Sequence, residues 1–195
     1  MLDTHARRFV EPVILEFARR LHARKVTADA VTWAALLVGV GAGALTWAGH
    51  PWLAVLALWL SGFLDAVDGS LARLSDASSA WGTVLDVTFD RVVELSVLFA
   101  LAVLYPDARL ALVGLVSTIV VGMTVFLTVG AVTEKKGVKS FYYQAGVGER
   151  TEGFVLLTAM LVFQERYLTE TTLVFVLMML VTIFQRLSEA RRILR

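Results

Sequence analysis

The sequence predicts an all-α integral membrane protein with six transmembrane helices, preceded by an N-terminal amphipathic helix at the membrane interface. Hydrophobic residues make up 57% of the 195 residues, more than soluble globular domains contain. No residue from position 30 to 64 is charged, and 35 residues at about 1.5 Å each exceed one crossing of a ~30 Å bilayer. The run must therefore turn back once, and Gly49-His50-Pro51 supplies the break.

The first 25 residues have the pattern of a helix that lies in the headgroup plane. Apolar side chains recur there at helical spacing, and arginines occupy most of the remaining surface. A soluble helix packed against a partner is the alternative. The apolar positions are Phe9, Val10, Val13, Ile14, Phe17 and Leu21.

Six apolar segments follow. The third and fifth begin with charged residues, so they cross the bilayer only if their polar first turns lie in protein or at a wet interface. The sequence contains no linker or internal repeat, which predicts one domain over residues 1–195. The predicted spans are about 29–49, 52–74, 80–105, 109–133, 142–164 and 169–188, forming a bundle over 29–188 behind an interfacial helix over 1–25.

Lysine and arginine are concentrated on one side of this topology. The side shared by both termini holds most of them, whereas the opposite side has only Arg109 and Arg166. By the positive-inside rule both termini are cytoplasmic, and we expect the cytoplasmic membrane of a bacterium or archaeon. The net charge is +1, without a solvated basic block, and this excludes the usual signature of a nucleic-acid-binding protein.

Four aspartates, Asp65, Asp68, Asp86 and Asp90, lie beside the most apolar segments. The first two are three residues apart and the last two are four apart, so each pair shares a helix face. A short connection between the second and third spans predicts antiparallel neighbours whose carboxylates converge near the cytoplasmic end. Charged groups in a membrane are costly, so these carboxylates require compensation.

Cations are the expected compensation. Hard oxygen ligands without His or Cys favour Mg²⁺, Mn²⁺ or Ca²⁺, and the chain has no cysteine. Two divalent ions bridged by carboxylates suit phosphoryl-type displacement. Small residues at Gly69, Ala72 and Gly82 would leave a groove beside the metals, with Arg73 at its rim to suit a phosphate.

Two other classes of site also use buried acids. A divalent-cation transporter or channel would need polar residues continuing across the bilayer, but the stretch from Ala44 to Leu64 offers very few. A purely structural metal site would leave the small residues and Arg73 without a purpose. The acids therefore predict a pocket at one membrane face.

The full pattern resembles the signature of the CDP-alcohol phosphotransferases, a membrane family of phospholipid synthesis. The resemblance implies two divalent cations, Mg²⁺ or Mn²⁺, with Asp90 as the general base and a further contact to the metals. It also implies attack by a small polar alcohol on the β-phosphorus of a CDP-linked lipid, release of CMP, and a homodimer. The pattern is Asp65-x2-Asp68-Gly69-x2-Ala72-Arg73-x8-Gly82-x3-Asp86-x3-Asp90, in which Asp65, Asp68 and Asp86 would bind metal and Asp65, Gly69, Ala72, Arg73 and Gly82 would line the nucleotide site.

The family often carries a Pro-Asn/Asp-x-x-Thr/Ser element before the first span. Here Asp29 and Thr32 keep two of its positions without the proline, and they are candidates for nucleotide contact. Capping of the helix by Asp29 or Thr27 is an equal alternative.

The acceptor is left open between inositol phosphate, glycerol phosphate and an unphosphorylated alcohol, as is a reversal of the lipid and alcohol roles. Glu149-Arg150 resembles the inositol phosphate enzymes, but Gly153 replaces their usual second arginine. Glu94, one turn beyond Asp90, is expected to orient Arg91 or Arg150. The candidate acceptor-binding cations are Arg91, Lys135, Lys136, Lys139 and Arg150, although the lysines could instead set the topology or meet anionic lipid.

Overall fold

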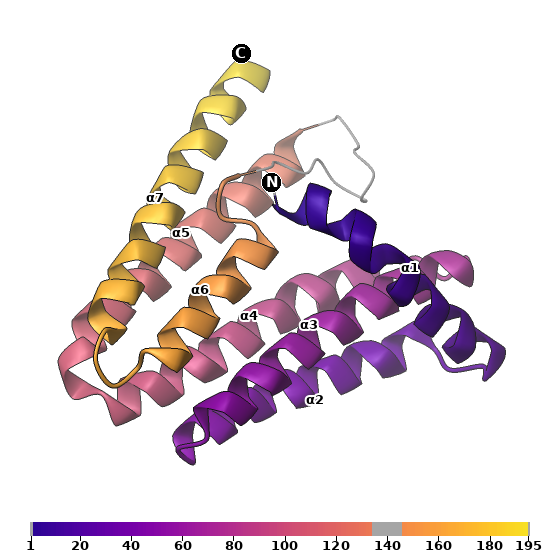
Figure 1. Ribbon diagram of the computed structural model, residues 1–195. Coiled ribbons are helices and arrows are strands. Elements are labelled where there is room, and N and C mark those ends of the chain that lie inside the picture. Colours follow the sequence, from indigo (N-terminus) through magenta and orange to yellow (C-terminus); the bar gives the residue numbers. More distant parts are fainter. Residues whose placement is uncertain (1, 134–145, 195) are drawn as a thin grey trace. The chain divides into compact units, whose positions relative to one another are not determined.

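The computed structural model describes residues 2–133 and 146–194, and the regular elements within them are all helical (Figure 1). This confirms the all-α class. The chain forms two compact units, Leu2–Leu104 and the part from Tyr105 onward, and the prediction of a single domain stays a prediction. The elements are α1 (Leu2–Ala23), α2 (Ala28–Trp47), α3 (Pro51–Leu74), α4 (Ala80–Leu104), η1 (Pro106–Ala108), α5 (Arg109–Val132), α6 (Arg150–Val162) and α7 (Leu168–Ile193).

Local chemistry explains where the first helices begin and end. Lys25 takes a positive φ of 58° in the turn after α1, and Thr27 caps α2 by accepting a hydrogen bond from the backbone of Ala30 at 3.3 Å. Gly49 has a φ of 77° after α2, a conformation that glycine adopts readily. Pro51 then opens α3, where its missing N–H costs nothing, so the predicted break is confirmed.

In the first unit, α2 packs against both α3 and α4. The sequence predicts α3 and α4 as antiparallel neighbours, and side chains of the two helices do meet, although in the described residues the closer backbone approach is that of α2 to each of them. Helix α2 comes this close because it carries small residues on the faces that it presents to α3 and α4.

Glycines account for the approach of α2 to α4. A Cβ atom on Gly43 would lie 2.6 Å from the backbone carbonyl oxygen of Ser96, and one on Gly39 would overlap the side chain of Val93. On the α3 side, Ser61 Oγ donates a hydrogen bond to the carbonyl of Ala35 at 2.8 Å. These two glycines therefore serve packing within the bundle.

Helix α1 packs on α3 through its apolar side chains. Ile14 and Ala18 join a buried cluster with Val67 and Leu71 of α3. Val13, in contrast, is 52% exposed, so apolar surface also remains on the outside of α1. The interfacial position of α1 stays a prediction.

In the second unit, α7 packs against both α5 and α6. The segment before α6 is tied to α7, because Val147 and Gly148 donate backbone hydrogen bonds to the side chains of Gln185 at 3.0 Å and Thr182 at 2.8 Å. Arg186 of α7 is only 7% exposed. Its guanidinium donates to the Gly122 carbonyl at 3.3 Å and lies 4.8 Å from the centre of the Phe126 ring.

Four segments of the described chain, α2, α3, η1 with α5, and α7, are long and apolar enough to cross a membrane. Helix α4 has 25 residues but carries Asp86, Asp90, Arg91 and Glu94. Helix α6 has 13 residues and is about 20 Å long, which is less than the ~30 Å hydrocarbon core. Six membrane crossings therefore stay a prediction.

We expect Gly43→Ala to lower the stability of the detergent-solubilised protein by about 1–3 kcal/mol, because the new methyl group meets backbone that cannot rotate away. Gly41→Ala is the matched control, since a Cβ atom there has nothing within 4 Å. Thermal unfolding monitored by circular dichroism measures both. Equal midpoints for the two variants would contradict the packing described for α2 and α4.

Candidate metal and substrate site

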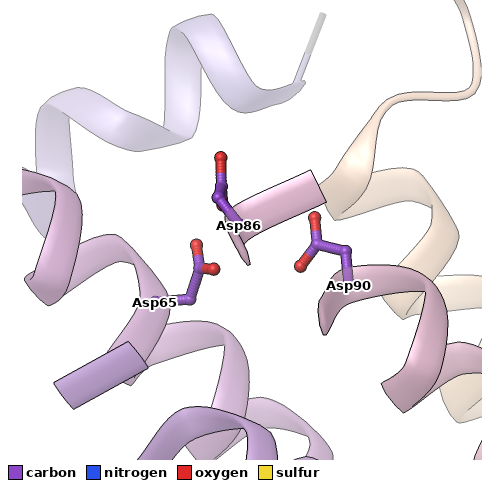
Figure 2. Close-up of side chains that lie close together, drawn as sticks. All are labelled: Asp65, Asp86 and Asp90. Atoms are coloured by element: carbon purple, nitrogen blue, oxygen red, sulfur yellow. The ribbon is translucent and has the colours of Figure 1, made fainter. Parts of the chain in front are cut away.

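Three of the four predicted aspartates lie together in the first unit (Figure 2). Asp65 projects from α3, and Asp86 and Asp90 project from successive turns of α4. One carboxylate oxygen from each lies within 4.8 Å of the other two, and none of the three side chains is fully exposed. The two helices thus contribute to one small volume, as the spacing predicts.

Asp68 lies one turn beyond Asp65 on α3 and is 8% exposed. It is not one of the three residues whose oxygens meet. The structure therefore separates the aspartates into a group of three and a buried neighbour. The role of Asp68 as a metal ligand stays a prediction.

The three carboxylates fit a hard divalent cation. Two oxygens bound to one ion at about 2.4 Å are at most ~4.8 Å apart, which matches the separation in this group. The ligand atoms are all oxygens, which favours Mg²⁺, Mn²⁺ or Ca²⁺ over zinc. Three negative charges at this distance repel one another, and a bound cation would offset that repulsion.

Arg73 stands near the end of α3 and is exposed, as a residue at the rim of a phosphate groove should be. Its Nη2 donates a hydrogen bond to the Oγ of buried Ser70 at 2.9 Å. A Cβ atom on Gly69 would meet Arg73 Nη1 at 3.6 Å, an ordinary contact, so packing within the described chain does not require a glycine there. Sequence reasoning missed Ser70, although its spacing of three residues from Arg73 was the available signal.

Gly82 lies in the first turn of α4. Its backbone N–H donates to Ser79 Oγ at 3.0 Å, which caps the helix. Ser79 was also missed, even though a serine just before an apolar helix is a common cap signal. Ala72, the remaining small residue of the predicted groove, is half-buried on α3.

Thr27 and Asp29 were the two candidates for the residue that caps the start of α2. Thr27 caps the helix, whereas Asp29 is exposed in the first turn. Thr32 is buried, and its hydroxyl donates to the Ala28 carbonyl at 3.1 Å. Nucleotide contacts by Asp29 and Thr32 stay predictions.

The candidate acceptor-binding cations fall into three groups. Arg91 of α4 forms an ion pair with Glu94, with 2.5 Å between Nη1 and Oε2, which is one of the two pairings expected for Glu94. Arg150 opens α6 in the second unit and lies 5.7 Å from the ring centre of Phe154. The three lysines, Lys135, Lys136 and Lys139, lie outside the described residues.

A family model described as CDP-alcohol phosphatidyltransferase matches residues 25–188. A phosphatidylinositol phosphate synthase of Corynebacterium glutamicum is 32% identical over 162 residues, covering 80% of this chain and 72% of that protein. The synthase of Streptomyces avermitilis is 37% identical over 107 residues, or 54% of this chain, and the matched region spans only 43% of that relative. The inner membrane protein YnjF of Escherichia coli is 29% identical over 80% of this chain and 79% of its own length.

Among solved structures, phosphatidylinositol phosphate synthase of Mycobacterium tuberculosis with CDP-DAG bound superposes with a TM-score of 0.77. The sequences are 20% identical, and the match covers 92% of this chain and 94% of that one. A second structure of that protein, in complex with manganese and citrate, gives a TM-score of 0.75 at 21% identity, covering 91% of this chain and 88% of that one. At these identities the superposition establishes a shared fold.

We expect Asp65→Asn to weaken Mn²⁺ binding by at least about tenfold, because even residues outside the first ligand layer of metal sites contribute that much. Electron paramagnetic resonance of free Mn²⁺ during titration of the purified protein measures the change. Asp76→Asn is the matched control: Asp76 is exposed in the turn after α3, and its φ of 49° suits asparagine. A normal Mn²⁺ affinity in Asp65→Asn would rule out the three-carboxylate site.

Proposed function

The chain belongs to the CDP-alcohol phosphatidyltransferase family, and we propose that it transfers a phosphatidyl group from CDP-diacylglycerol to a small polar alcohol, releasing CMP. The observation that carries the proposal is the meeting of Asp65, Asp86 and Asp90 at one cation-sized volume. The CDP-DAG bound by the Mycobacterium tuberculosis synthase supports a CDP-linked lipid as the donor.

Asp90 is the general base of the proposed reaction. Its carboxylate accepts the proton of the acceptor hydroxyl as that oxygen attacks the β-phosphorus, and the bond from this phosphorus to the oxygen of CMP breaks. Its place beside Asp65 and Asp86 supports this role, since a base must lie within reach of the reacting phosphate. Asp90 lies one helical turn after Asp86 in α4.

Asp65, Asp68 and Asp86 would hold two divalent cations, Mg²⁺ or Mn²⁺, with a further contact from Asp90. When bound, such ions neutralise the charge of the diphosphate and of departing CMP. The manganese in the second Mycobacterium tuberculosis structure supports this choice of metal.

The nucleotide subsite of the proposal combines α3 with the starts of α2 and α4. Ser70 holds the guanidinium of Arg73, which lowers the entropy lost when that group binds a phosphate oxygen. The residues that would line this subsite are Asp29, Thr32, Asp65, Gly69, Ala72, Arg73 and Gly82. Packing within the described chain does not require a glycine at position 69, and this supports close approach of a ligand there.

Inositol phosphate is the acceptor that the named relatives favour, with glycerol phosphate as the second candidate. A phosphorylated acceptor requires cations, and the candidates are Arg91, Arg150, Lys135, Lys136 and Lys139. Arg91 is paired with the carboxylate of Glu94, and a guanidinium in such a pair still has other N–H donors. This supports a role for Arg91 in binding the acceptor phosphate.

The topology proposed for this reaction has six crossings, with α1 at the interface and the aspartates and both termini on the cytoplasmic side. Helices α4 and α6 would cross with their polar first turns in contact with protein or water. We also propose a homodimer in a bacterial or archaeal cytoplasmic membrane. Membership of the family leaves the divalent-cation transporter alternative without support.

Purified protein in CDP-diacylglycerol micelles with Mg²⁺ or Mn²⁺ should release CMP when inositol phosphate is added. Glycerol phosphate, inositol and serine serve as parallel acceptors, and EDTA should abolish the release because the cations are removed. CMP release with a different single acceptor would correct the substrate and keep the reaction class. A lack of release with every acceptor, and with the donor and acceptor roles exchanged, would refute the proposal.

Asp90→Asn should lower the rate of CMP release by about 10²–10⁴-fold, since an amide cannot accept the proton. Binding of CDP-diacylglycerol should change little, because the variant keeps the shape of the side chain. Single-turnover assays and equilibrium binding of the labelled lipid separate the two effects. A turnover rate near that of the unsubstituted protein would show that another group is the base.

A further inference from the structure

Glu94 is a buried acid that the proposed reaction does not use. Glu94 is 7% exposed. It lies on α4 one turn beyond Asp90, on the helix face that also carries Asp86. Its carboxylate pairs with Arg91, which directly follows the proposed base. The side chain of Arg91 is only 28% exposed, so most of the ion pair is withdrawn from water.

A guanidinium at position 91 is a potential competitor for the cation site. Cα atoms of adjacent residues are about 3.8 Å apart, and an arginine side chain is longer than that. Adjacent helical side chains point about 100° apart, so Arg91 reaches the carboxylate of Asp90 only if its long, flexible side chain bends toward it. A permanently charged guanidinium on that carboxylate would offset the negative charge that attracts a divalent ion.

The geometry of the pair opposes this competition. Glu94 follows Arg91 by three residues, so both side chains lie on neighbouring positions of one helix surface. Side chains in a helix lean toward its N-terminus, and this direction brings the Glu94 carboxylate back to the turn that carries Arg91. The contact of 2.5 Å engages Nη1 of the guanidinium, while its Nε is buried without a hydrogen-bond partner.

We propose that Glu94 is a positioning residue that holds the guanidinium of Arg91 away from the aspartates and offsets its charge, so that Asp65, Asp86 and Asp90 remain available to divalent cations. This inference rests on the proposed metal site.

The test compares Mn²⁺ binding by the full-length protein and its variants in detergent, using paramagnetic resonance of free Mn²⁺ and no turnover. Glu94→Gln should weaken Mn²⁺ binding by about ten- to a hundredfold, the range measured for groups that support metal ligands. Adding Arg91→Gln to this variant should restore the affinity to within about threefold, because the competing charge is then gone.

The exposed pair of Glu16 and Arg20, with 2.8 Å between its charged atoms, provides the control. Glu16→Gln makes the same chemical change on α1 and should leave Mn²⁺ binding unaltered. An unaltered affinity in Glu94→Gln would overturn the inference, and so would a double variant that stays as weak as the single one. The second result would mean that Glu94 acts through the fold or on the metal itself.

The design also covers loss of folding. If Glu94→Gln does not fold, the double variant, which removes both charges together, still has to bind Mn²⁺ as the unsubstituted protein does, and a loss of binding there overturns the inference. Failure of the unsubstituted protein to bind Mn²⁺ would overturn the metal site, and with it this role of Glu94. Normal Mn²⁺ binding without CMP release would refute only the proposed reaction.

Discussion

Carboxylates on two different helices can share one cation only if those helices keep a fixed separation. In this protein α2 sets that separation, because it packs against both α3, which carries Asp65, and α4, which carries Asp86 and Asp90. Gly39 and Gly43 bring α2 close to α4. Lipid tails are as apolar as the helices, so close packing of this kind, together with a few hydrogen bonds, provides the attraction between helices in a membrane.

The same arrangement places the acids near one exposed end of α3 and α4. Residues 73–81, which comprise the end of α3, the connection and the start of α4, are all exposed, and Asp86 lies five residues further along α4. In the proposed topology this end of the helices faces the cytoplasm, where a charged group costs less than it would at the middle of the bilayer. In the proposed reaction the polar substrate enters from this side, and the lipid substrate meets the apolar surfaces of the earlier turns of α3 and the later turns of α4.

The sequence predicted those features that depend on local chemistry. Gly49 and Pro51 fixed the first turn between spans, and the spacing of Asp86 and Asp90 placed both on one face of α4. The sequence did not indicate that Asp68 lies apart from the other three aspartates, because the side chains of α3 that meet α4 depend on how the helices pack. The short α6 was predicted to be longer, since an apolar stretch marks a span but not the residue at which its helix begins.

The buried Arg186 of α7 determines how α7 is aligned along α5. Apolar helices can slide along each other by a turn with little loss of contact, but Arg186 meets both the carbonyl of Gly122 and the ring of Phe126 in only one register. Sliding α7 by one turn, about 5.4 Å, would leave its charge without either partner in an apolar interface. The alignment of α5 with α7 is therefore encoded within the helices themselves.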